Sequence, residues 1–163
     1  MATLSVWRFP TADGAEKAEE TLAQLQAEGL IKVHDAALAT WPEGKKRPKT
    51  RQAHNLTGAG ALGGAFWGLL FGIIFFIPII GLAIGAAAGA LAGSLTHAGI
   101  DEQFIQQVRD KVTPGTSALF VLTSDAVMDK VADRFEGTQA ELVSSNLSKD
   151  QEQALLSAFS EDH

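Results

Sequence analysis

The residue types that most often carry chemistry are few in this sequence and widely spaced. The histidines are His34, His54, His97 and His163. None stands at metal-ligand spacing from another, so each is expected to be structural or solvated. Three aspartates, Asp125, Asp129 and Asp133, recur every four residues and should share one face of a helix. This stripe lacks the loop spacing of an EF-hand, which favours a solvated face over a calcium site.

The rest of the chain contains no catalytic motif that we recognise. It has no cysteine, which excludes a disulfide framework, a thiol nucleophile and cysteine-ligated zinc. It also has no GxxxxGK[ST] phosphate loop and no GxSxG nucleophile elbow. His34 and Asp35 are adjacent on a predicted strand, so their side chains would point to opposite faces. We therefore expect no catalytic residue, no metal site and no cofactor, and we predict that the protein is not an enzyme.

Charge is distributed unevenly over the 163 residues, whose formal net charge is −6. Residues 1–41 carry −3, residues 42–55 carry +4 and residues 100–163 carry −7. This balance excludes a globally basic nucleic-acid binder, and no specific nucleic-acid partner is expected. The first residues lack the basic and apolar regions of a secretory signal, so none is predicted.

A long apolar segment separates the two acidic parts of the chain. Residues 56–95 are forty residues without a charge, interrupted by Pro78. A single helix of that length would span about 60 Å, twice the hydrocarbon core of a bilayer. Two helices of about 20 residues each, turning near Pro78, fit a bilayer better. We therefore predict a transmembrane helical hairpin over residues 56–98.

Glycines within this segment recur at four-residue steps. The helix-packing residues predicted from this spacing are Gly60, Gly64, Gly68 and Gly72 in the first half, and Gly81, Gly85, Gly89 and Gly93 in the second. Glycine costs about 1 kcal/mol relative to alanine in a helix, so eight at helical spacing need a reason. Stripes of small residues allow two helix backbones to approach closely. The two stripes either face each other within one hairpin, mate with other subunits, or lie in the protein core of a soluble oligomer.

A basic stretch comes directly before the apolar segment. Its cations are Lys45, Lys46, Arg47, Lys49 and Arg51. Two prolines and a glycine in residues 42–55 argue against regular structure there. Cationic residues beside a membrane segment bind anionic lipid headgroups and indicate its cytoplasmic side. We predict a basic linker that contacts a lipid bilayer through its headgroups, although a solvated loop or a weak nucleic-acid patch is the simpler interpretation.

The flanking parts alternate strand and helix patterns. Residues 3–9 and 31–41 predict strands around a helix that begins near Asp13 and Glu16, which have capping-box spacing, and Asp35 predicts a bulge in the second strand. After the apolar segment we expect a helix at 101–112, a central strand at 117–123 and a helix from 124. A strand at 139–147 and a terminal helix opened by a Ser148–Gln151 capping box complete this part.

This order predicts an α+β fold with a ferredoxin-like split β-α-β head and an inserted glycine-zipper transmembrane helical hairpin. The domains are then a first β-α-β half at 1–41, the linker at 42–55, the hairpin at 56–98, and the second half with extra helices at 99–163. About 41 residues is near the lower limit for an isolated fold, so the two halves should share one sheet.

The paired glycine spacing, 60–72 and 81–93, resembles that of a bacterial predicted membrane protein family of unknown function with a double glycine-zipper hydrophobic segment. The resemblance extends over nearly the whole chain, with its β-α-β start, basic linker and acidic end. It implies a bacterial membrane-associated protein, with a link to stress. It brings no catalytic residues.

Together these features predict a non-enzymatic, membrane-embedded scaffold that forms a homo-oligomer through its glycine-zipper helices. The expected location is the bacterial inner (cytoplasmic) membrane, with both termini cytoplasmic, because the basic linker favours that side. Two alternatives stay open: a pore or channel, and a small-molecule sensor head anchored by the hairpin.

Overall fold

The computed structural model describes residues 2–46, 48–52, 67, 70–76, 100, 102–124, 128–135, 140–151 and 153–154. Its strands are β1 (Ala2–Phe9), β2 (Lys32–Thr40), β3 (Lys49–Gln52), β4 (Ser117–Ser124) and β5 (Glu141–Leu147). Its helices are α1 (Gly14–Ala27), the π-helical turn η1 (Gly72–Phe76), α5 (Glu102–Lys111) and α6 (Met128–Arg134).

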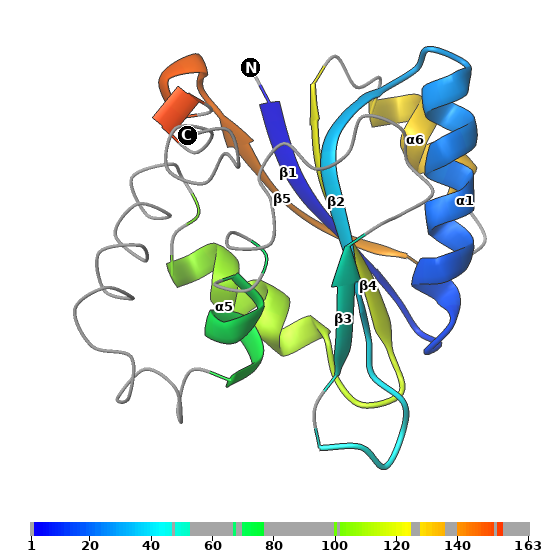
Figure 1. Ribbon diagram of the computed structural model, residues 1–163, viewed down its shortest axis with the longest axis vertical. Coiled ribbons are helices and arrows are strands. Elements are labelled where there is room, and N and C mark those ends of the chain that lie inside the picture. The colour runs from blue at the N-terminus through cyan, green and yellow to red at the C-terminus, as the bar shows by residue number, and fades with distance from the viewer. Residues whose placement is uncertain are drawn as a thin grey trace.

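The strands form one antiparallel sheet in the order β3-β2-β4-β1-β5. Strand β4 lies between β1 and β2, and β1 lies between β4 and β5. In the series β2, β4, β1 and β5, strands that precede and follow the apolar segment therefore alternate. Helices α1 and α6 cover one face of this sheet, and α5 and η1 lie on the other (Figure 1). The sheet is therefore the middle layer of three.

Side-chain alternation along the strands supplies both faces. Leu119 and Val121 of β4 pack toward α1, whereas Phe120 and Leu122 pack toward α5 and η1. Residues Ala118 to Leu122 are all buried, as the continuous apolar run predicts for a central strand. In β2, Val33 pairs with Thr123 and Asp35 pairs with Leu122, leaving His34 as an extra residue. The bulge predicted at Asp35 is thus confirmed.

Helix α1 is held by an apolar stripe and by a hydrogen bond from another part of the chain. Its buried apolar residues are Ala15, Ala18, Leu22 and Leu25. Asp13 makes no side-chain cap hydrogen bond, so the predicted Asp13–Glu16 capping box is wrong. Instead the backbone N–H of Ala15 donates to the hydroxyl of Ser117 at 2.9 Å. Gly29, at φ +79°, follows the helix in the left-handed conformation.

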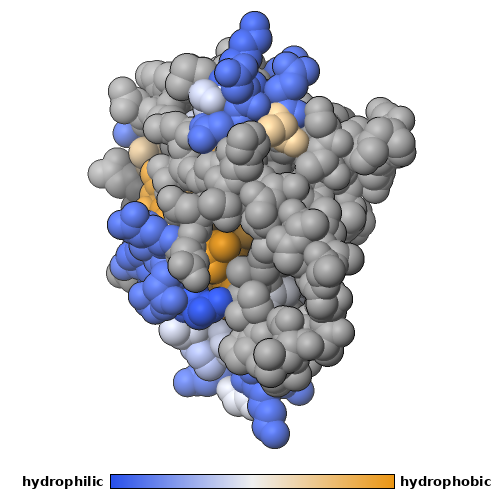
Figure 2. Space-filling model, turned by 90° about the vertical axis from the view of Figure 1, so that its left-hand side faces the viewer, coloured by the Kyte–Doolittle hydropathy of each residue, from blue (hydrophilic) through white to orange (hydrophobic). Residues whose placement is uncertain are grey.

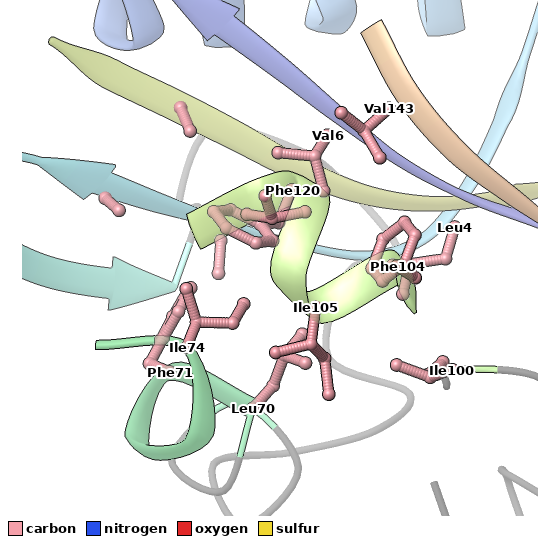
Figure 3. Packing of buried hydrophobic residues seen from close by; sticks show 14 of the residues in the cluster. Leu4, Val6, Leu70, Phe71, Ile74, Ile100, Phe104, Ile105, Phe120 and Val143 are labelled. Atoms are coloured by element: carbon pink, nitrogen blue, oxygen red, sulfur yellow. The ribbon is translucent and has the colours of Figure 1, made fainter. Parts of the chain in front are cut away.

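The opposite face of the sheet packs against α5 and the segment around η1. Figure 2, which looks onto this side, shows a small hydrophobic area with hydrophilic residues beside it at the lower left. In Figure 3, Phe104 of α5 lies beside Leu4 of the sheet, and Ile105 of α5 points toward Leu70, near Phe71 and Ile74. The residues they meet on the sheet include Leu4, Val6 and Phe120. One continuous apolar core therefore joins the first part of the predicted hairpin to the sheet.

This arrangement corrects the predicted fold class, the membrane and transmembrane-hairpin assignment, and the inner-membrane localisation with both termini cytoplasmic. Among the residues that the structure describes, none belongs to a helix long and apolar enough to cross a membrane. Most of residues 56–98 lies outside that part of the chain. Its described residues, such as Phe71 and Ile74, are buried on the sheet rather than turned toward lipid. These residues are apolar because they cover a face of the antiparallel sheet.

The predicted lack of regular structure in the linker is also wrong in part. Residues 49–52 form β3, which pairs antiparallel with β2 from Ala37 to Thr40. Lys49 and Arg51, assigned to an irregular headgroup contact, are therefore edge-strand residues. Short strands with charged residues are typical of protected sheet edges.

Candidate functional site

Of the eight glycines predicted to pack helices, the structure describes Gly72. Gly60, Gly64, Gly68, Gly81, Gly85, Gly89 and Gly93 lie outside the described residues. Gly72 is the first residue of η1 and is half-buried. A Cβ added to it would meet no atom within 4 Å. The described fold therefore leaves room for a side chain at this glycine.

The segment that carries Gly72 is fixed to the sheet by its neighbours. Leu70, Phe71 and Ile74 are each 5% exposed or less. The Arg109 Nε of α5 donates a hydrogen bond to the Ile74 carbonyl oxygen at 2.9 Å. The π-helical turn is thus anchored by apolar burial and by a side chain from another element. Single π-helical turns are rare and often occur at functional sites.

Aromatic rings extend this anchoring. Trp67 and Phe71 stack with ring centroids 5.8 Å apart, and Phe71 and Phe75 stack at 6.2 Å. Phe71 also meets Phe120 of β4 edge-on at 4.9 Å, and Phe75 meets Trp41 edge-on at 5.9 Å. These geometries are the favourable ones for aromatic pairs, each worth about 0.5–1.5 kcal/mol beyond burial. The rings connect residues 67–75 to two separate parts of the sheet domain.

The predicted headgroup residues do not act as one group. Lys45 and Lys46 are exposed in the loop after β2, and Arg47 lies outside the described residues. Lys49 is exposed on β3. Arg51 instead forms a 3.0 Å ion pair with the carboxylate of Glu19, which is 1% exposed on α1. Headgroup binding by these cations stays a prediction, and one of them also has a role inside the fold.

A second charged cluster joins α5 to the sheet. The Arg8 Nε donates to the Lys111 carbonyl oxygen at 3.1 Å, at the carboxyl end of α5. Glu141 of β5 accepts from the Lys111 ammonium at 3.3 Å and lies 4.0 Å from the Arg8 guanidinium. Two cations thus share one carboxylate across β1, β5 and α5. This cluster was not expected, because Arg8, Lys111 and Glu141 are far apart in the sequence.

An apolar hollow of about 220 Å³ lies at the start of α1, and it was not expected either. Its lining includes Phe9, Gly14, Ala18 and Phe135. Lys17 stands at this hollow and forms an exposed ion pair with Asp13 at 3.4 Å. The hydroxyl of Thr11 and the Lys17 ammonium lower the pKa of Asp13 below its ordinary 3.8. The Asp13 carboxylate is therefore favoured in its ionised form beside the first turn of α1.

The sequence of residues 61–160 matches a protein family described as "Protein of unknown function (DUF1269)". The chain belongs to the DUF1269 family. The match includes η1, α5, β4, α6 and β5, but it does not reach β1 or β2. No curated protein and no solved structure matches the chain.

The position of β1 relative to the match has a structural consequence for this DUF1269 chain. Strands β4 and β5 lie within the matched residues, yet they do not pair with each other. Both pair with β1, from outside the match. The sheet therefore needs β1, which precedes the matched residues 61–160, as well as the strands within them.

The histidines and aspartates considered for chemistry in the DUF1269 chain do not converge in the described part. His34 is at the β2 bulge, and Asp133 is exposed on α6. Asp125, His54, His97 and His163 lie outside the described residues, as does the side chain of Asp129. Within the described ranges, no three His, Asp or Glu side chains are grouped as metal ligands would be.

Proposed function

We propose that this chain is a non-enzymatic assembly protein that associates with copies of itself through the glycine-spaced segment, residues 60–93. The observation that carries the proposal is the open space beside Gly72. A glycine inside a helix costs roughly 0.5–1 kcal/mol relative to alanine, and nothing in the described fold requires that cost here. Close approach by a second copy of the chain gives a reason for glycine at this position.

The anchoring of η1 supports the same function. Residues 70–74 are held by the core and by Arg109, so Gly72 is presented on a fixed backbone. A preorganised surface loses less conformational freedom on association than a loose segment does. The remaining glycines continue the same four-residue spacing on both sides of Pro78. A contact that begins at Gly72 has the pattern needed to extend along the segment.

The substitution Gly72→Ala separates an intramolecular role from an intermolecular one. Because a Cβ fits within the described fold, the free energy of unfolding should stay the same or rise by about 0.5–1 kcal/mol. Self-association should weaken by about tenfold, which corresponds to roughly 1.4 kcal/mol of lost contact. Sedimentation equilibrium measures the association, and urea unfolding measures the stability. Gln103→Ala, at an exposed position of α5, is the control.

Two double variants test the rest of the segment. Gly64→Leu with Gly68→Leu, and Gly85→Leu with Gly89→Leu, place bulky side chains on either stripe. At least one pair should reduce the particle mass. The proposal fails if the unmodified chain sediments as a monomer at every concentration, or if neither pair nor Gly72→Ala changes the association constant.

A further inference from the structure

The two edges of the sheet are built differently. Strand β3 is four residues long and carries two cations, Lys49 and Arg51. Strand β5 is seven residues long, and its one charged residue, Glu141, is at its first position. Exposed sheet edges are usually short, charged or interrupted by proline, because these features prevent pairing with another chain. Edge β3 has this protection, whereas residues 142–147 of β5 have none of it.

Strand β5 also carries the large hydrophobic residue that the described surface exposes. Leu142 is 41% exposed, whereas Val143 and Leu147 are buried against the α5 face. Among the described strands, β5 has β1 as its one partner. The charge of Glu141 is matched by Lys111 of its own chain at 3.3 Å. Residues 142–147 of this edge therefore offer backbone groups and an apolar side chain without a charge.

We propose that β5 pairs antiparallel with β5 of a second copy of this chain, across a two-fold axis at Ser144. A two-fold axis perpendicular to the sheet leaves each side chain on its own face. Because directly opposed side chains of an antiparallel pair also share a face, the axis must pass at a residue of the strand and not between two residues. An axis at Ser144 is the choice that pairs all seven residues. It places Glu141 opposite Leu147 of the partner subunit and Leu142 opposite Asn146 of the partner subunit.

The charge pattern favours a second copy as the occupant. In this register the two Glu141 positions are separated by six residues along the ladder, or about 20 Å. No like charges therefore face each other. An isologous contact of this kind closes on itself and joins the two sheets into one. The contact does not involve Gly72 and does not rest on the function proposed above.

The absence of cysteine from the sequence allows a direct test. Opposed residues of an antiparallel pair have Cα atoms about 4.5–5.5 Å apart, within the range that a disulfide spans. Ser144→Cys should therefore form a covalent dimer under mild oxidation, seen on a non-reducing gel. Thr50→Cys, an exposed residue of the protected edge strand β3, is the matched control and should stay monomeric. Circular dichroism checks that both variants fold.

Two further variants complete the test. Leu142→Lys in the Ser144→Cys chain puts a charge on the edge and should abolish the covalent dimer. Gly72→Ala in the same chain should leave it intact, which separates this contact from the glycine-mediated one. The pairing is refuted if Ser144→Cys stays monomeric, if Thr50→Cys crosslinks as well, or if Leu142→Lys leaves the dimer unchanged.

Discussion

Glycine has three different roles in this protein, and each depends on its immediate surroundings. A Cβ at Gly14 would lie 2.5 Å from the Cβ of Phe9, so a side chain cannot fit where α1 begins against β1. Gly29 has a φ of +79°, which other residues adopt at a cost of roughly 1–2 kcal/mol. Gly72 meets neither constraint. Sequence spacing alone does not distinguish these roles.

Gly14→Ala should therefore destabilise the fold. The added methyl group meets the rigid base of the Phe9 side chain, and relieving such a contact costs about 1–3 kcal/mol. Urea unfolding should show a lower midpoint with an unchanged slope. Gly72→Ala, which adds the same methyl group in open space, is the control. Equal midpoints for Gly14→Ala and the unmodified chain would show that α1 and β1 can move apart freely.

Strand β3 is linked to α1 as well as to β2. The Glu19 carboxylate is almost fully buried, and the Arg51 guanidinium reaches it from the edge strand at 3.0 Å. A buried carboxylate is tolerated because it is paired, and removing its partner leaves a charge with poor solvation. Arg51 is 40% exposed, so solvent screens part of the interaction. The pair nevertheless connects two elements that are 32 residues apart in sequence.

Arg51→Gln should destabilise the fold by about 1.5–3 kcal/mol, the range for losing a hydrogen bond to a charged group. Lys49→Gln removes an exposed cation from the same strand and should change the stability by about 0.5 kcal/mol or less. Adding Glu19→Gln to Arg51→Gln should recover part of the loss, because the buried charge is then gone. Urea unfolding of the unmodified chain, Arg51→Gln, Glu19→Gln and the double variant gives a double-mutant cycle, and Lys49→Gln is measured beside it. Equal effects of the Arg51 and Lys49 variants would exclude a structural role for the ion pair.

Elements set by local pattern were predictable from the sequence. The alternation at residues 3–9, the apolar run at 117–123 and the interruption at Asp35 correspond to β1, β4 and the β2 bulge. The capping box at the final described helical turn is also confirmed. The backbone N–H of Ser148 donates to the Gln151 side chain at 2.9 Å, and the backbone N–H of Gln151 donates to the Ser148 hydroxyl at 3.1 Å.

Features set by distant partners were not predictable in this way. The start of α1 is satisfied by Ser117, about a hundred residues away, instead of by Glu16. Phe71 belongs to the segment predicted to cross a membrane, because an apolar helix face in a bilayer and one on a sheet have the same sequence pattern. β3 is too short and too charged to give a strand pattern. For the candidate site, the spacing identified Gly72 but not the space around it.

At the scale of the whole molecule, two surfaces are proposed for self-association. One is the glycine-spaced segment, of which the structure describes Gly72 on η1, and the other is the β5 edge. Gly72 and the β5 edge belong to different elements, so we propose that a single copy uses both. A chain with two separate contacts assembles beyond a dimer.

Size-exclusion chromatography with light scattering should therefore give the unmodified chain a mass above that of a dimer. Gly72→Ala alone should shift the particles toward dimers joined through β5, and Leu142→Lys alone toward those joined through the glycine segment. The chain with both substitutions should shift toward monomers. A doubly substituted chain that keeps the native mass would show that assembly uses neither surface.

The place of β1 in the sheet also governs when the protein can fold during synthesis. Both neighbours of β1 come late in the chain: Phe9 pairs with Ser117, and Ala2 pairs with Leu147. At about 5–20 residues per second, the ribosome needs roughly 6–23 seconds between making β1 and making β4. During that time the first strand, with Trp7 and Phe9, lacks both its neighbours in the sheet. The nascent chain is thus exposed to aggregation until β4 and β5 have been made, and this is the interval in which a chaperone would act.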